Sequence, residues 1–201
     1  MAETKQKLPL KTQMLIWRAR FSTPALLARF DEKKVVACIT GINAGLAIFV
    51  LSLTAWLTDL PLVFPALGPS AFILFSAPLS KAGAPRSVVL GHWICLATGF
   101  CVWHLISYIA GEPVSMGNGD WSVLVSASLT LAFCGILMVR FSCPHPPACA
   151  SGLVVGLGAI TAVPDILFMA GAIGWLAFQA YGMNRWAGLP VPFWSYKERE
   201  I

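Results

Sequence analysis

Long uninterrupted apolar runs constrain this chain more than any other feature of its sequence. Such runs occupy residues 35–58, 88–110, 121–139 and 165–182. Each is long enough to cross the hydrocarbon core of a bilayer as a helix, the last of them at the lower limit. Of the 201 residues, 57% are hydrophobic and only 11% are charged. That balance does not suit a soluble globular domain, and it predicts an all-α protein embedded in lipid.

Two further apolar segments, 62–77 and 144–163, are short and interrupted by proline and glycine. As a helix, residues 62–77 would measure about 24 Å, less than the ~30 Å of a bilayer core. Unpaired backbone groups are costly in hydrocarbon, so broken helices are tolerated there only inside protein or beside water. The sequence therefore predicts two short broken helices surrounded by the four long ones.

The positions of the charges predict six crossings of the membrane. With six crossings, all 14 Lys and Arg fall on one side, in residues 1–34, around Lys81 and Arg86, at Arg140 and in the tail. The opposite loops then contain only acidic charges, at Asp59, Glu112, Asp120 and Asp165. By the positive-inside rule, both termini are cytoplasmic. The alternative has four crossings and two re-entrant loops, and it places Lys81 and Arg86 on the same side as Asp59.

The same pattern divides the chain into three parts. Residues 1–34 form a basic, amphipathic cytoplasmic segment suited to an anionic membrane surface. Residues 35–183 form the transmembrane domain, and residues 184–201 a cytoplasmic tail. Because the positive charges gather at the chain ends and in one loop, the net charge of +5 does not indicate a nucleic-acid partner. We expect a multi-pass protein of the bacterial cytoplasmic membrane.

The order of long and short segments predicts an internal repeat. Each half of the chain has a long segment, a short broken one and another long one. Three crossings per half is an odd number, so the halves would have opposite orientations in the membrane. This 3+3 inverted repeat is the arrangement of many transporters, in which paired broken helices mark the binding site.

The broken helices predict an anion site near the membrane midplane. Proline suits the first turn of a helix, so we expect helices to start near Pro69 and near Pro146. Two helix N-termini facing each other present partial positive charge and free N–H donors to a small anion. The competing interpretation is a proline kink with a capping histidine. The candidate binding residues are Gly68, Pro69, Ser70, Ala71, His145, Pro146, Pro147 and Ala148, together with His92 and Asn43.

Other functions have weaker support in the sequence. His92 and His145 are candidates to share a haem or a metal ion, which is the alternative function. A third interpretation is a purely structural membrane subunit, whose helix breaks enclose no cavity. The sequence has no nucleophile motif, glycine-rich phosphate loop or paired carboxylates, so we expect neither an enzyme nor, for a transporter, a cofactor. The Gly41-x3-Gly45 and Gly152-x3-Gly156 spacings indicate tight helix packing, within the chain or in a homodimer.

The sequence "FPALGPSAFILFSAPLSKAGAPRSVVLGHW", followed by "HPPACASGL", resembles the HPP family of integral membrane proteins. The family takes its name from the triplet that stands here as His145-Pro146-Pro147. The resemblance implies an anion transporter or channel with nitrite as the leading substrate, because family members in cyanobacteria and chloroplasts are associated with nitrite transport. The family is usually described as having four spans, whereas we predict six. A histidine near such a site could couple transport to protons.

Overall fold

The computed structural model describes residues 14, 19, 21–117 and 120–195. Within this part of the chain all regular structure is helical. Four helices are long and apolar enough to cross a membrane, which confirms an all-α membrane protein. The helices are α2 (Thr23–Leu27), α3 (Glu32–Thr58), α4 (Leu67–Ser76), α5 (Pro85–Ala110), α6 (Trp121–Arg140), α7 (Ala148–Gly156) and α8 (Val163–Trp186).

The long helices begin where the sequence provides caps. The Asp31 side chain accepts a hydrogen bond from the Lys34 N–H at the start of α3. Asp120 does the same for two N–H groups at the start of α6, which satisfies donors that the helix cannot pair itself. A hydrogen bond from the Ser122 hydroxyl lowers the pKa of Asp120, so this cap is ionised at neutral pH. Pro85 opens α5, at a position that needs no N–H donor.

The two short helices differ from the predicted ones in their limits. Helix α4 begins at Leu67, two residues before Pro69, so this proline lies inside the first turn, where its missing N–H costs nothing. Helix α7 begins at Ala148, two residues after the predicted Pro146. It ends at Gly156, because the chain then turns through Gly158 in the left-handed region (φ 75°). Each short segment is therefore part helix and part irregular chain.

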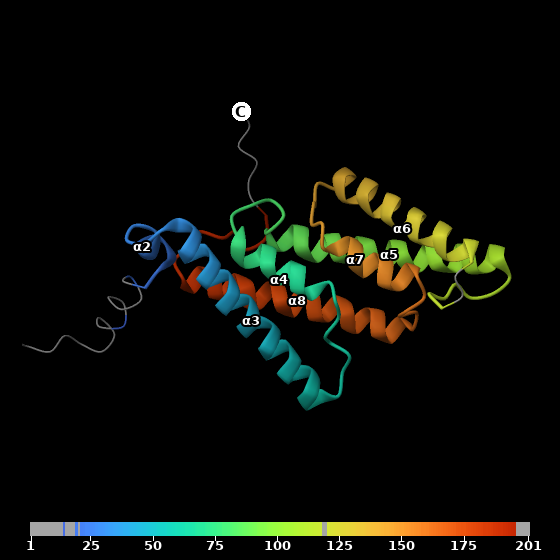
Figure 1. Ribbon diagram of the computed structural model, residues 1–201, viewed down its shortest axis with the longest axis horizontal. Helices are drawn as coiled ribbons and strands as arrows, with labels where there is room; N and C mark the ends of the chain where they lie inside the picture. Colours follow the sequence, from blue (N-terminus) through green and yellow to red (C-terminus); the bar gives the residue numbers. More distant parts are fainter. Residues whose placement is uncertain (1–13, 15–18, 20, 118–119, 196–201) are drawn as a thin grey trace, which may run out of the picture.

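The short helices occupy the middle of the molecule (Figure 1). From their first turns there, they run in opposite directions, away from each other (Figure 1). Helix α4 packs against α3 and α8, and α7 packs against α6 and α5. In addition, α3 contacts α8, α6 contacts α5, and α5 contacts α8. Exchanging α3 with α6, α4 with α7 and α5 with α8 leaves this set of contacts unchanged.

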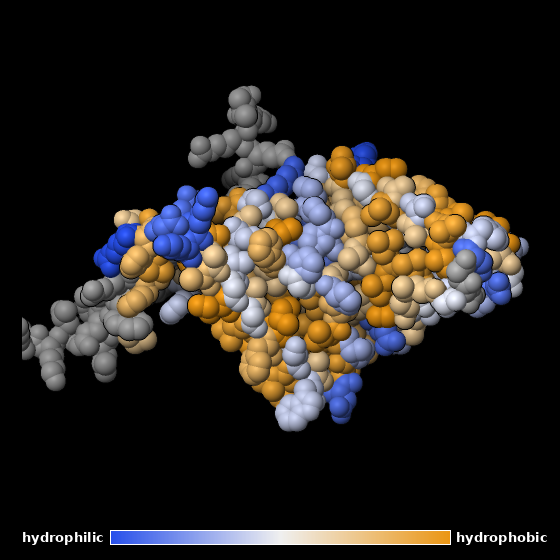
Figure 2. All heavy atoms as spheres, in the orientation of Figure 1, coloured by the Kyte–Doolittle hydropathy of each residue, from blue (hydrophilic) through white to orange (hydrophobic). Residues whose placement is uncertain are grey.

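Polarity is inverted relative to a water-soluble protein. The visible face of the molecule is mainly hydrophobic, and the strongest hydrophilic colour lies near the helix ends (Figure 2). Large side chains such as Trp56, Phe72, Leu124 and Phe178 are exposed on the long and short helices. Several polar side chains, two histidines among them, are instead fully buried. This is the distribution expected where lipid, and not water, surrounds the helices.

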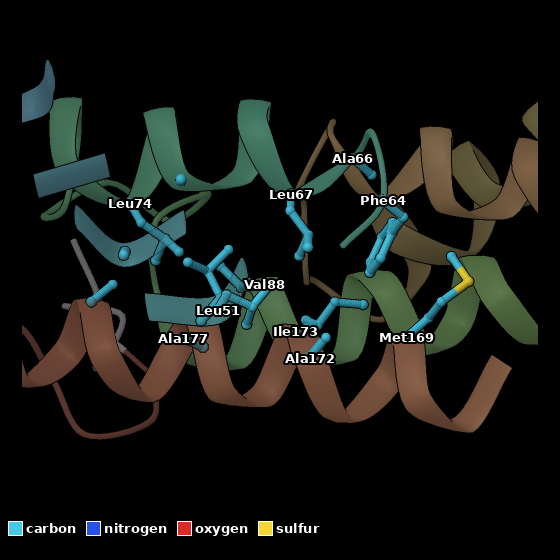
Figure 3. Close-up of a cluster of buried hydrophobic side chains, with 14 of the residues drawn as sticks. Leu51, Phe64, Ala66, Leu67, Leu74, Val88, Met169, Ala172, Ile173 and Ala177 are labelled. Atoms are coloured by element: carbon cyan, nitrogen blue, oxygen red, sulfur yellow. The ribbon is translucent and has the colours of Figure 1, made fainter. Parts of the chain in front are cut away.

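The main apolar core lies between α3, α4, α5 and α8. Leu67 and Leu74 project from α4 towards Ala172, Ile173 and Ala177 on α8 (Figure 3). The C-terminal end of α4 is also fixed to α8, because the Asn184 side chain donates a hydrogen bond to the Leu74 carbonyl (2.9 Å). These contacts hold the first turn of α4 in the centre of the molecule.

A second contact region, between α5, α6 and α7, depends on glycine. A Cβ atom at Gly152 would lie 2.8 Å from Cys134 Sγ and 2.9 Å from the Cys95 carbonyl oxygen. Gly156 lies against Thr130 in the same way. The Gly152-x3-Gly156 spacing therefore serves packing within the chain. Gly41 and Gly45 on α3 have no neighbour within 4 Å of an added Cβ.

Charge separates the two ends of the helix bundle. The described Lys and Arg of the long helices lie where α3 and α5 begin and where α6 and α8 end, which we call the basic end. Asp59, Glu112, Asp120 and Asp165 lie at the other end, without a described Lys or Arg. Of the predicted amphipathic segment, α2 is described; Pro24 stands in its first turn, and most of residues 1–20 lie outside the described residues.

Candidate functional site

Four polar side chains meet where the short helices approach each other. Ser70 comes from the first turn of α4, His92 from α5, His145 from the segment before α7, and Ser151 from α7. All four are at most 1% exposed. We call Ser70, His92, His145 and Ser151 the polar cluster. Burying polar groups among apolar helices is costly unless they bond to each other, which these do.

Ser70 is the centre of the polar cluster. Its hydroxyl oxygen lies 2.9 Å from His92 Nε2 and 3.0 Å from His145 Nε2. It also lies 2.8 Å from the carbonyl oxygen of Ala66, one helical turn earlier. One hydroxyl thus has two imidazoles and one carbonyl within hydrogen-bond distance, although it has a single hydrogen to donate.

The far side of each imidazole is also held. His145 Nδ1 lies 2.8 Å from the Ala82 carbonyl oxygen, in the turn between α4 and α5. His92 Nδ1 lies 2.7 Å from the Ser151 hydroxyl. Both rings are therefore fixed at both nitrogens, and their centroids are 5.1 Å apart.

With both histidines neutral, one arrangement of hydrogens gives a partner to every ring nitrogen of the cluster. A carbonyl can only accept, so His145 Nδ1 has the hydrogen and His145 Nε2 accepts from Ser70. Ser70 then accepts from His92 Nε2–H, and His92 Nδ1 accepts from the Ser151 hydroxyl. We assign a single direction to the whole chain of hydrogen bonds, from Ser151 through His92, Ser70 and His145 to Ala82.

The local backbone explains why the rings fit. A Cβ at Gly91 would stand 3.1 Å from the Cβ of His145, so a larger residue there would displace this histidine. The Ala82 carbonyl is held by a compact turn, in which the Gly83 N–H bonds to Ser80. A Cβ at Gly83 would lie 2.5 Å from the Ala77 carbonyl, and the turn requires glycine at this point.

A polar cavity of about 540 Å³ lies at the basic end, beside the turn that holds His145. The Arg86 guanidinium donates hydrogen bonds to the carbonyls of Phe141 (3.0 Å) and Ser142 (2.9 Å), three residues before His145. Lys81 is the chain neighbour of Ala82. We call this space the basic cavity, and it is lined by Lys81, Arg86, Ser87, Ser142 and Ser195 together with Leu79 and Ala84.

The predicted site residues separate into three groups. Ser70, His92 and His145 come together in the polar cluster, with Ala71, Pro147 and Ala148 buried around them. Gly68, Pro69 and Pro146 are exposed. Asn43 lies elsewhere: it lines a separate cavity of about 430 Å³ between α3 and the end of α8.

Sequence reasoning missed Ser151 and the carbonyls of Ala66 and Ala82. Ser151 carried a usable signal, because it is the fourth residue of α7 as Ser70 is the fourth residue of α4. His92 bridges these two equivalent serines. The carbonyl partners carried no signal, since any residue provides one.

The expected free N–H donors are not found at the start of α7. The N–H groups of Ala148, Cys149 and Ala150 bond to the carbonyls three residues before them. In this conformation the polar cluster is closed and its hydrogen bonds are internal. An anion would have to replace some of these partners.

In this conformation the polar cluster leaves no histidine nitrogen free for a metal ion or a haem iron. Structural zinc sites use four protein ligands and catalytic ones three, and the described residues contain no group of three or more His, Cys, Asp or Glu side chains placed to hold a metal. His92 Nε2 and His145 Nε2 both face the same serine hydroxyl, and the opposite nitrogens are engaged.

Comparison with known protein families gives a match over most of the chain. The family described as HPP, transmembrane region, matches residues 31–187, which includes every helix from α3 to α8. No curated protein and no solved structure matches the chain significantly.

Proposed function

Because this chain belongs to the HPP family of transmembrane proteins, we propose that it carries a small inorganic anion across the membrane, with nitrite as the leading substrate. The observation that carries the proposal is the polar cluster. Ionisable side chains within membrane helices are costly and mark substrate or ion pathways. Here two such side chains converge with two serines at the junction of the two broken helices.

The anion would bind between the first turns of α4 and α7. When the cluster opens, the Ser70 and Ser151 hydroxyls and the His92 Nε2–H become available as donors. The partial positive charge of two helix N-termini adds to them. None of these groups carries a permanent charge, which suits a monovalent anion that must also be released.

The basic cavity supports a route to this site from one side. Lys81 and Arg86 line it, and positive charge in a recess raises the local concentration of anions. We place the basic end in the cytoplasm by the positive-inside rule, in a bacterial cytoplasmic membrane. The basic cavity would then be the cytoplasmic vestibule.

We further propose that the two halves form a 3+3 inverted repeat with six membrane segments. Two observations support the repeat. Among α3 to α8, the same pairs of helices are in contact when the halves are exchanged, and Ser70 and Ser151 hold the same position in α4 and α7. Each half would contribute one short helix to the site, as in other transporters built this way.

Nitrite flux into proteoliposomes tests the proposed function. We expect flux well above that of protein-free liposomes, which account for passive permeation of nitrous acid. Ser70→Ala should lower the flux about tenfold or more, the loss expected for one hydrogen bond to a charged ligand. Ser126→Ala is the matched control, because Ser126 is equally buried and bonds to the Gly156 carbonyl, away from the cluster.

Two results would contradict parts of this proposal. Absence of nitrite flux in the wild-type protein would remove nitrite as the substrate, and nitrate, chloride and formate would be tested in the same liposomes. An equal loss in Ser70→Ala and Ser126→Ala would show that Ser70 acts through packing rather than through the anion.

A further inference from the structure

We infer that the polar cluster binds a proton together with the anion, and that the proton resides on His145. This inference rests on the proposed function and adds the way in which transport is driven. It follows from the geometry around Ser70, from the protein groups near His145 and from the charges that are missing there.

The Ser70 hydroxyl can serve two protonation states without moving any heavy atom. With His145 neutral, the Ser70 O–H donates to His145 Nε2 (3.0 Å). When a proton adds to the lone pair of Nε2, this nitrogen becomes the donor and the Ser70 O–H rotates towards the Ala66 carbonyl (2.8 Å). His145 Nδ1–H donates to Ala82 in both states. Every hydrogen bond of His145 is therefore satisfied before and after protonation.

His92 has no hydroxyl partner that can serve both of its protonation states in this way. If His92 Nδ1 were protonated, the Ser151 hydroxyl would have to accept and direct its own hydrogen elsewhere. Among the hydrogen bonds of the described residues, Ser151 Oγ has His92 as its one partner. Two positive imidazoles with centroids 5.1 Å apart would also repel each other. The cluster is therefore built for one added proton.

Among the residues that the structure describes, the surroundings of His145 supply no negative charge. The titratable groups near it are His92 on α5 and the thiols of Cys143 and Cys149 on either side in the chain. Lys81 and Arg86, beyond Ala82, are positive. None of the hydrogen bonds of the cluster involves a carboxylate. The described Asp and Glu lie at the ends of the long helices: Asp31, Glu32, Asp59, Glu112, Asp120 and Asp165.

A buried imidazolium without a counter-ion is strongly unfavourable. The anion supplies the missing negative charge, and the imidazolium supplies the positive charge that the anion site lacks. Each ligand therefore favours the other, and the pair crosses as a neutral unit. We expect uptake that follows the proton gradient, carries no net charge, and falls by up to tenfold per unit of rising pH once His145 is mostly neutral.

Uptake measured at clamped membrane potential tests this directly. Proteoliposomes with potassium and valinomycin are given an inward proton gradient, and nitrite accumulation is followed. We expect accumulation in the wild-type protein that does not change with the clamped potential. His145→Gln should lose the response to the gradient, about tenfold or more. His104→Gln should keep it within about twofold, because His104 is an exposed histidine of α5 outside the cluster.

Flux that ignores the proton gradient and responds to the potential would overturn coupling and leave the anion-transport function intact. Absence of flux for nitrite, nitrate, chloride and formate alike would overturn both. If His145→Gln does not fold, calorimetry of nitrite binding to the wild-type protein decides the matter. Heats that differ between buffers of different ionisation enthalpy, by the amount for one proton per anion, support the inference, and heats independent of the buffer overturn it.

Discussion

At the scale of single residues, the polar cluster shows how an almost uncharged interior can still hold reactive groups. His92 and His145 are fully buried, yet each ring nitrogen has a partner. These partners favour one tautomer of each ring, and the tautomer determines which nitrogen has the lone pair that can bind a further proton. The chemistry of the site therefore depends as much on Ser70 and Ala82 as on the histidines.

Ser151 offers a test of the far end of this chain of hydrogen bonds. Ser151→Ala leaves His92 Nδ1 buried without a partner, which we expect to lower the free energy of unfolding by about 1–3 kcal/mol. Thermal unfolding in detergent measures the loss. Ser128→Ala is the control, since that exposed hydroxyl bonds only within its own helix, to Leu124. Equal stability of both variants would mean that the Ser151 bond contributes little.

The sequence identified Ser70, His92 and His145 because helix breakers and ionisable groups are unusual in apolar segments. It did not identify Ala82, Ser142 or the presence of a cavity beside Lys81 and Arg86. Partners such as His145 and Ala82 are 63 positions apart, and only packing brings them together. Asn43 was included for the same reason as His92, a polar group in a span, but α3 turns it towards α8 instead.

At the scale of elements, hydropathy predicted the long helices, and the prolines placed the starts of the two short helices to within two residues. The observed limits of α3, α5, α6 and α8 agree with the predicted runs to within four residues. The limits of α4 and α7 were shifted, because proline fits several positions of a first turn and so does not mark the starting residue. The end of α7 depends on a left-handed turn at Gly158, which hydropathy does not report.

The contact of α7 with α5 and α6 should be sensitive to any added volume. Gly152→Ala would place a methyl group 2.8 Å from Cys134 Sγ and 2.9 Å from the Cys95 carbonyl, which forces the helices apart. We expect a loss of about 1–3 kcal/mol in the free energy of unfolding. Gly135→Ala on α6, with no neighbour within 4 Å, is the matched control and should unfold at the wild-type temperature. A stable Gly152→Ala protein would show that α7 can move aside.

At the scale of the whole molecule, inverted polarity and separated charge are the features that the sequence anticipated best. Composition alone required exposed apolar helices, and the structure has them. Among the described residues, the Lys and Arg of the long helices lie at the basic end, and Asp59, Glu112, Asp120 and Asp165 lie at the other end, as predicted. The number of crossings depends on whether the short segments span the bilayer. Charge and packing favour six crossings, whereas composition does not determine the number.

Labelling with a membrane-impermeant thiol reagent in intact cells tests the six-segment topology. Pro61→Cys, before α4, and Lys81→Cys, after it, are both exposed positions. Six segments place them on opposite sides, so only Pro61→Cys should react from outside. The wild-type protein gives the background from Cys38 and Cys101. Labelling of both variants from the same side would favour four crossings with re-entrant loops.

The polar cluster is completed late in synthesis, because its residues come from both halves of the chain. His92 leaves the ribosome 53 positions before His145 (145 − 92), and Ser70 leaves it 75 positions before (145 − 70). At roughly 5–20 residues per second, the delay between His92 and His145 is about 3–10 s. During that time Ser70 and His92 can bond to each other, while their partners from the second half, His145 and Ser151, do not yet exist. The first half of the protein is therefore made before its polar groups have all of their hydrogen-bond partners. Until the second half is made, the side chains of Ser70 and His92 depend on the insertion machinery or on lipid for their surroundings.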